Sequence, residues 1–555
     1  MKINSSESHR SSGGAGLRPA LIRVARSATP PGFATGLSQR EKTHLVVGQL
    51  ALRAVALAFA LAAFLPAASA QLAPPPAPAL LAPAQGIAPA FAPAAALPGV
   101  VRSQFTGVDP AVIQQLQSKQ VTQVRLPMFG HGERILVFTG REDHGPGRFA
   151  LTGTLDGISP SSAVLAVWDG AVTLDAHGHG ENNVRLRNAG QGVNGGYWLE
   201  EMNPAAQGVC GVDDHAPAPL IAPAAAGNAA QGNWMPAAGD GNLWADVLAY
   251  YTPLARDAAG GDAAMSSLIA SYVATANAVH TASVTFFRVR LVRISLMDYS
   301  GFTTGSDLLS KLSDTNDGVM DNVSADITEF GADLIHLWAT FSDGGTLNGI
   351  AGTTGSFGVN RWDEPQQTFT HESGHNLGCL HQISGGVNNN TNGTIEHAHE
   401  ATYDFYFLGI FDSTARARTI MWGSSGPTVI DRFSDPNNTV TFSHIILPNS
   451  PPIPIGVAGS ANNAQYIRNE RTRTVGRKEP RFYVSPGGDG QATPHSPANN
   501  LTSVYDAWYF NTWGQTATNP VVVRVAAGNI PAPARIATRS RLEKWGGGGN
   551  ARITR

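Results

Sequence analysis

Apolar and polar positions change their spacing several times along the chain, and each change predicts a different kind of segment. The most apolar run is AVALAFALAAFLPAASA at 54–70. It is shorter than the roughly 20 residues of a membrane-spanning helix, and it ends in the Ala-Ser-Ala pattern that precedes signal-peptide cleavage. We therefore expect 1–70 to be a leader with a signal peptide and the protein to be secreted. An uncleaved amphipathic anchor is the alternative, and the intact cleavage pattern counts against it.

Two tracts rich in Ala and Pro, 71–103 and 216–242, lack the variety that a packed core needs and predict linkers, the second of them cleavable. Between them, 104–215 carries short alternating runs such as RILVF at 134–138 and AVLAVW at 163–168. Turns containing Gly, Pro or Asp close these runs. This spacing predicts a small antiparallel β domain.

A second globular domain is expected over 243–480. Its first segments read as a strand at 244–253, a helix at 263–280 from the spacing of the apolar residues, and a strand at 284–296. A further strand is expected at 332–338. Strands that alternate with helices predict an α/β sheet layered with helices.

Charge and cysteine content exclude several classes of protein. The chain has 38 Lys and Arg against 41 Asp and Glu, a net charge of −3, and only 14% charged residues. It therefore lacks the basic field of a nucleic-acid-binding or membrane-surface protein. Its 555 residues are too many for one domain, and two cysteines are too few for a disulfide scaffold.

The candidate chemistry lies in TFTHESGHNLGCLHQ at 368–382, which has the spacing His-Glu-x-x-His-x-x-Gly-x-x-His. His371 and His375 are four residues apart, so on a helix they share one face and can bind one ion. Gly378 is expected to end that helix in the left-handed conformation and to let His381 approach from another direction. Three imidazoles leave the fourth position of a single Zn²⁺ open to water, as in catalytic sites.

Glu372 follows the first of these histidines and is the predicted general base. Bound zinc lowers the pKa of water and polarises a scissile carbonyl. The Glu372 carboxylate is placed to accept the proton of the water and to hand it to the leaving amine. The motif therefore predicts a zinc-dependent endopeptidase, a hydrolase of peptide bonds.

Met421 lies in TIMWG at 419–423, which resembles the Met-turn beneath the zinc ligands of metzincins. Because it carries both this turn and the histidine motif, the chain resembles the reprolysin-like metzincin zinc endopeptidases. It is similar in particular to the bacterial peptidyl-Asp metalloendopeptidase group. The segments 245–261, 331–338 and 456–475 resemble the first strand, a central strand and a C-terminal helix of these enzymes.

The resemblance implies a metzincin catalytic domain with a five-stranded, mostly parallel sheet above a cleft, the zinc helix at its floor and a smaller C-terminal subdomain. It also implies cleavage beside acidic residues, for which Arg361 is a candidate pocket cation. Gln382 stands where many reprolysins have Asp, a departure that removes no zinc ligand. The Asn-rich segment 385–393 offers oxygen atoms but no carboxylate, so a calcium ion there is unsupported.

Cys210 lies at the end of the predicted β domain, just before the second linker. Because a thiolate is a strong zinc ligand, one hypothesis is that 104–215 is a propeptide and that Cys210 occupies the open zinc position until the linker is cleaved. This would resemble the cysteine switch of other metzincin precursors. The alternatives are a disulfide between Cys210 and Cys379, and two inert thiols.

The tail, 481–555, resembles the opening of right-handed parallel β-helix domains: a strand, a Gly/Asp turn, a helix and a Val-rich strand. Such solenoids need stacked neighbours. The tail is therefore expected to be a truncated appendage, to pack on the protease, or to be a disordered end.

Two functions remain open. The favoured one is a secreted zinc endopeptidase made as a zymogen, and the alternative is an exported binding or adhesion protein with an inactive metzincin domain. Retention of His371, His375, His381 and Glu372 favours catalysis, because a binding module does not need the general base. The expected partners are protein or peptide substrates and an activating protease, with no nucleic acid and no membrane span after leader cleavage.

Overall fold

The computed structural model describes the following residues of the chain: 76–84, 99–178, 183–189, 196–203, 209–210, 242–343, 347–382, 395–407, 410–423, 429–442, 449–475, 477–478, 481–486, 493–494, 497–498, 501, 504, 521–531, 540–545 and 551–554. The chain separates into two compact units, 1–75 and 76–555, and all described residues belong to the second. The predicted leader 1–70, the Asn-rich segment 385–393 and, except for Asn242, the predicted linker 216–242 lie outside the described residues.

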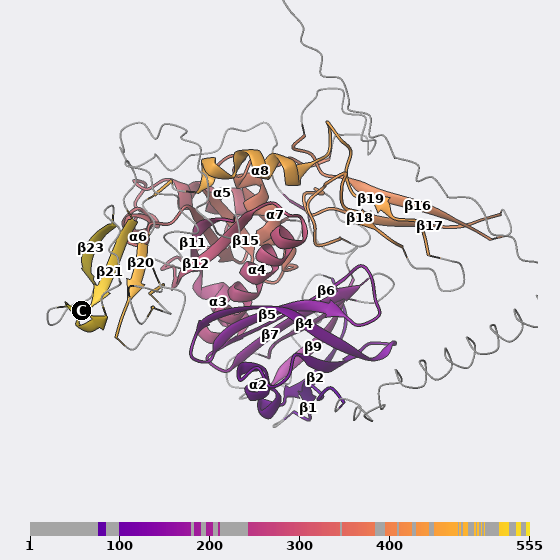
Figure 1. Ribbon diagram of the computed structural model, residues 1–555, viewed down its shortest axis with the longest axis horizontal. Coiled ribbons are helices and arrows are strands. Elements are labelled where there is room, and N and C mark those ends of the chain that lie inside the picture. Colours follow the sequence, from indigo (N-terminus) through magenta and orange to yellow (C-terminus); the bar gives the residue numbers. More distant parts are fainter. Residues whose placement is uncertain are drawn as a thin grey trace, which may run out of the picture. The chain divides into compact units, whose positions relative to one another are not determined.

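The first element group is a nine-stranded antiparallel sheet in the order β1-β2-β9-β8-β7-β6-β5-β4-β3. Its strands are drawn in indigo and purple in Figure 1. The strands are β1 (Leu81–Ala82), β2 (Val100–Val108), β3 (Gln123–Met128), β4 (Gly132–Gly145), β5 (Arg148–Leu155), β6 (Ser161–Trp168), β7 (Ala171–Gly178), β8 (Asn183–Asn188) and β9 (Tyr197–Met202). One face of the sheet packs with helix α2 (Pro110–Gln117) into a core of its own. The alternating runs seen in the sequence are thus strands of a β-rich region.

The sheet begins earlier than the sequence indicated. Part of the tract expected to be a linker, 71–103, forms β1 and the start of β2, and Leu81 pairs with Val108. Leu80 is fully buried, and Arg125 Nε donates to the Ala77 carbonyl at 2.8 Å. Pro-rich backbone favours extended conformations, so it can lie along a sheet edge once a neighbouring strand is available to pair with.

The second sheet has the order β10-β14-β15-β13-β11-β12 and is parallel except for the antiparallel pair β14 and β15. Its strands are β10 (Val209–Cys210), β11 (Leu243–Tyr251), β12 (Phe287–Leu296), β13 (Leu334–Ala339), β14 (Leu347–Ala351) and β15 (Phe357–Arg361). Five strands come from residues after 242, and β10 comes from the segment before them. β11 and β13 are almost entirely apolar because helices cover both faces of a parallel sheet.

The helices of this α/β region are α3 (Pro253–Ala259), α4 (Asp262–Ala282), α5 (Gly305–Ser313), α6 (Asn322–Phe330) and α7 (Gln367–Asn376). α4, like α7, is buried around its whole circumference, as expected of a helix that packs on two sides. α4 contacts β12 and α7 on one side and β5, β6 and β7 of the nine-stranded sheet on the other. The two sheets therefore share the core that surrounds α4.

After α7 the chain forms a hairpin of β16 (Glu400–Phe407) and β17 (Ile410–Arg418), a short pair of β18 (Thr439–Val440) and β19 (Ile453–Pro454), and helix α8 (Asn463–Thr474). The hairpin and the short pair share a small apolar core. α8 falls within 456–475, where the sequence predicted a C-terminal helix.

The tail contains two sets of parallel strands. β20 (Arg481–Val484), β21 (Val521–Ala526) and β23 (Ser540–Trp545) form one, and β22 (Gly528–Pro531) and β24 (Ala551–Thr554) form the other. Arg290 of β12 is fully buried, ion-pairs with Asp246 at 2.7 Å and donates to the Arg481 carbonyl at 3.1 Å. Its guanidinium also lies 4.6 Å from the ring centre of Phe482. β20 of the tail therefore packs against β12 of the second sheet.

Within the described part of the chain, no helix combines the length and the apolar character needed to cross a membrane.

Candidate metal centre and active site

Helix α7 carries two of the three predicted ligands, and its end positions the third. Gly378 has a φ of +95°, which a residue with a Cβ rarely adopts. Its N–H donates to the His375 carbonyl at 2.8 Å, and the Cys379 N–H donates to the Gly374 carbonyl at 2.9 Å. These two bonds form a Schellman motif, which ends the helix and reverses the chain. His381 consequently returns toward the face of α7 that carries His371 and His375.

The three imidazoles converge on one point. Nε2 of His371 lies 3.2 Å from Nε2 of His375, and Nε2 of His381 lies 3.1 Å from each of them. Nδ1 of His371 donates to the Ile420 carbonyl at 2.7 Å, and Nδ1 of His375 donates to the Cys379 carbonyl at 2.8 Å. With the proton on Nδ1, each of these two rings directs the lone pair of Nε2 toward the shared point, which is how hydrogen bonds to the outer nitrogen orient histidines at metal sites.

This donor set fits a zinc ion. Nitrogen ligands at about 2.0–2.1 Å in a tetrahedral site lie roughly 3.4 Å from one another, close to the separations seen here. Burial, followed by the neighbouring His381 ring, lowers the pKa of His371 to about 3, and burial lowers the pKa of His381 to about 4. Burial also lowers the pKa of His375. Three neutral imidazoles are the protonation state that metal binding requires.

Glu372 lies beside this cluster on the same helix and is almost completely buried. Burial raises its pKa to about 8, an effect that a hydrogen bond from Cys210 partly offsets. Its Oε2 atom lies 3.8 Å from Cys210 Sγ. A carboxylate in this position is next to the ligand atoms without being part of the histidine triad, as the role of general base requires.

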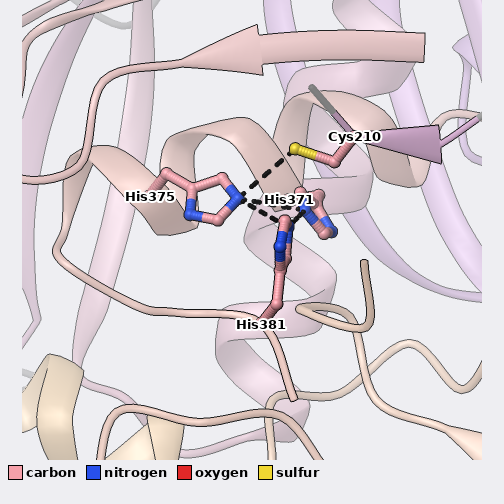
Figure 2. Close-up of side chains that lie close together, drawn as sticks. All are labelled: Cys210, His371, His375 and His381. Carbon is pink, nitrogen blue, oxygen red and sulfur yellow. Dashed lines mark hydrogen bonds between the residues drawn. The ribbon is translucent and has the colours of Figure 1, made fainter. Parts of the chain in front are cut away.

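The structure also brings Cys210 to the histidines. Figure 2 shows its side chain reaching them from outside α7, and Cys210 Sγ lies 3.5 Å from His375 Nε2. The ligand atoms of Cys210, His371, His375 and His381 all lie within 4.8 Å of one another. β10 holds the thiol there because it pairs in parallel with β14, with Cys210 opposite Gly349. The four residues therefore form a candidate metal-binding group.

The disulfide that the sequence left open is not formed. Among the described residues, no disulfide joins Cys210 to Cys379, and Cys379 is fully buried. Burial raises the pKa of the Cys379 thiol. Cys379 therefore packs as a small apolar residue at the end of α7, and Cys210 is the cysteine whose sulphur faces the histidines.

Gly374, which the sequence did not single out, and Gln382 shape the floor of the site. A side chain at Gly374 would collide with the sulphur of Met421, which is fully buried. The Gln382 side chain accepts a hydrogen bond from the Gly423 N–H at 2.9 Å and so ties the segment after the third histidine to the Met421 turn. The departure at Gln382 thus has a structural role, and the Gly before His375 was the available signal for close packing beneath α7.

Arg361 does not supply a cationic pocket. Its side chain is buried and ion-pairs with Asp363 at 2.7 Å and with Glu364. These two carboxylates neutralise the guanidinium, so the residue is an internal ion pair at the end of β15.

Comparison with known families agrees with this geometry. Residues 243–434 match the family model Reprolysin_5, described as metallo-peptidase family M12. The match supports a reprolysin-like metalloprotease. The matched residues extend from β11 through the zinc motif and the Met421 turn, and the family that the model describes is one of metallo-peptidases. The alternative of a binding or adhesion protein is not favoured.

Comparisons with curated proteins and with solved structures add no further relative that informs the function. No curated protein matches the chain. Among solved structures, a chain titled "Structure of a chaperone-substrate complex" aligns with a TM-score of 0.30 and 19% identity. The alignment covers 43% of this chain and 35% of that chain, so this chain spans about a third of the length of that protein.

Proposed function

We propose that the protein is a secreted zinc endopeptidase made as a latent precursor, with His371, His375 and His381 as zinc ligands and Glu372 as general base. The observation that carries this proposal is the convergence of three Nε2 atoms within 3.2 Å of one another beside a buried carboxylate. Three adjacent nitrogen lone pairs are a stable arrangement only when a cation lies between them. Secretion rests on the leader predicted at 1–70.

The chain's own residues account for proton transfer. A bound zinc ion would lower the pKa of a water molecule and polarise the scissile carbonyl. The Glu372 carboxylate accepts a proton from the attacking water and delivers it to the leaving amine nitrogen, so the carboxylate is regenerated in each cycle. The backbone carbonyls of Ile420 and Cys379 keep Nδ1 of His371 and His375 protonated and leave Nε2 free to bind metal.

The position of the substrate follows from the sheet. β14 would be the edge of the sheet if β10 were displaced, since β10 is its outer neighbour. An extended peptide can pair with such an edge strand through its main chain. Gly349 on β14 lies opposite Cys210, so a peptide in this place would pass the zinc ligands and Glu372.

The same geometry supports the proposed latency. Cys210 occupies the space beside His375 that a water molecule or a scissile carbonyl would need. A thiolate there would complete a closed four-ligand zinc site. We also propose, from the sequence resemblance, that the protein belongs to the bacterial peptidyl-Asp group, with a pocket cation other than Arg361.

The test uses the full-length precursor with Cys210→Ser, alone and combined with Glu372→Gln, and an unfolded protein as substrate. We expect Cys210→Ser to hydrolyse the substrate, a chelator to abolish this hydrolysis, and Glu372→Gln to reduce it by about 10²-fold or more. Zinc counted by elemental analysis should be about one per chain in both variants. Hydrolysis that survives Glu372→Gln would contradict the assigned mechanism.

A further inference from the structure

We infer that the nine-stranded sheet remains docked on α4 after the chain is cut between β10 and β11 and keeps Cys210 at the metal centre, so that this single cut leaves the enzyme latent. The inference rests on the proposed function of Cys210, and it changes the expectation that cleavage of the second linker is sufficient for activation.

The nine-stranded sheet and α4 cover apolar surface on each other. Along β6, Ala163, Leu165 and Val167 point into the core of the sheet itself, whereas Val164, Ala166 and Trp168 belong to the core around α4. β6 is thus apolar on both faces. On α4, the apolar residues Ala264 and Leu268 are buried along with the other faces of the helix. Separation of the two would expose apolar surface on both partners.

Buried polar contacts also join the sheet to the protease region. Ser267 Oγ of α4 donates to the Ala166 carbonyl at 3.0 Å, and Asn277 Nδ2 donates to Glu142 Oε1 at 2.9 Å. On β8, Arg185 Nη1 donates to the Asp363 carbonyl at 2.6 Å. Such satisfied buried contacts add specificity to an apolar interface.

A further contact reaches the segment that carries the zinc ligands. His177 of β7 lies 3.4 Å from a carboxylate oxygen of Asp175 on its own strand and 3.4 Å from one of Asp431 in the protease region. Gln367, the first residue of α7, donates to Asp431 Oδ1 at 3.0 Å. The sheet is therefore attached at α4 and also at the start of α7.

β10, which carries Cys210, is much smaller than the contact between the nine-stranded sheet and α4. β10 consists of two residues paired with β14 alone. β9 ends at Met202 and β10 begins at Val209, so a docked sheet holds Cys210 on a short tether. Tethering at this length keeps the effective concentration of the thiol near the millimolar range. A cut on the carboxyl side of Cys210 does not remove that tether.

The experiment inserts a recognition sequence for a site-specific protease between Ala225 and Ala226 of the full-length precursor, with and without Cys210→Ser. After cutting, gel filtration measures whether the two fragments co-elute, and hydrolysis of an unfolded protein measures activity. We expect co-elution in both proteins. We also expect the cut chain with Cys210 to remain about 10²-fold less active than the cut Cys210→Ser chain.

A second insertion, between Ala205 and Ala206, provides the matched control. Cutting at both places frees β10 as a short peptide, so activity should rise to the Cys210→Ser level while the sheet still co-elutes. Separation of the fragments after the single cut, or full activity of the single-cut chain with Cys210, would overturn the inference. Co-elution together with a Cys210→Ser chain that shows no Glu372-dependent hydrolysis would instead overturn the proposed function, and the retained latency with it.

Discussion

Cys210 Sγ lies 3.5 Å from His375 Nε2, although 165 positions separate the two residues in the sequence. The contact depends on β10 joining the same sheet that α7 packs against, through its parallel pairing with β14. The thiol is therefore placed by the fold of the second sheet as well as by its own segment. This relationship makes the proposed metal centre and the proposed latency testable together.

The first prediction concerns metal binding. His381→Gln removes one of three convergent nitrogen atoms, so we expect the purified variant to lose most of its zinc. Glu372→Gln is the matched control, because Glu372 lies outside the triad and its variant should retain about one zinc per chain. Elemental analysis after dialysis against a weak chelator measures both. Equal zinc content in the two variants would argue against His381 as a ligand.

The second prediction concerns the packing beneath α7. Gly374→Ala introduces a methyl group that collides with the Met421 sulphur, and overpacking of this kind costs about 1–3 kcal/mol of unfolding free energy. Urea unfolding measures the loss. In the double variant Gly374→Ala with Met421→Ala, the collision is absent, so the effects of the two changes should be clearly non-additive. Strict additivity would show that the two residues do not press on each other.

The third prediction concerns pH. Burial by itself lowers the pKa of His177, but the Asp431 and Asp175 carboxylates outweigh burial and raise the pKa to about 10 from an ordinary 6.5. The protonated form is thus favoured by folding. Its contribution to stability is complete below about pH 6.5, declines as the pH rises, and is lost above about pH 10.

Urea unfolding of wild type and His177→Gln across this range measures that contribution. The stability advantage of the wild type should be largest near pH 6.5, on the order of a few kcal/mol, and should vanish toward pH 10. An advantage that is constant with pH would mean that His177 contributes through packing alone.

The fourth prediction concerns the tail. Phe482 is fully buried against Arg290, so Phe482→Ala should lower the unfolding free energy of the protein by about 3–5 kcal/mol. Leu542 on β23 is 39% exposed, and Leu542→Ala should have little effect. Thermal unfolding compares the two. Equal, small effects would mean that the tail is an appendage that does not stabilise the protease region.

Much of the local structure followed from the sequence. The four-residue spacing of His371 and His375 determines that they share a helical face, and Gly378 determines where that helix ends. The apolar spacing at 263–280 predicts α4, because a helix needs only its own residues to show its period.

Contacts between segments that are distant in the sequence could not be predicted from local residue spacing. β1 forms within an Ala/Pro tract because β2 offers it an edge to pair with. Arg361 is neutralised by Asp363 and Glu364 only once β15 and the turn after it are folded. The pairing of a strand and the neutralisation of a charged side chain both depend on which segments come into contact in the folded chain.

The sequence by itself thus predicted the candidate ligands, the candidate general base and the helix that presents them, since these lie within one short segment whose geometry is set by local backbone bonds. Only the tertiary structure decided that Cys210 faces the histidines, that Cys379 does not pair with it, and that one helix, α4, joins two sheets. The physical reason is that a strand edge and an apolar surface specify only the kind of partner, and the folded chain determines which segment occupies them.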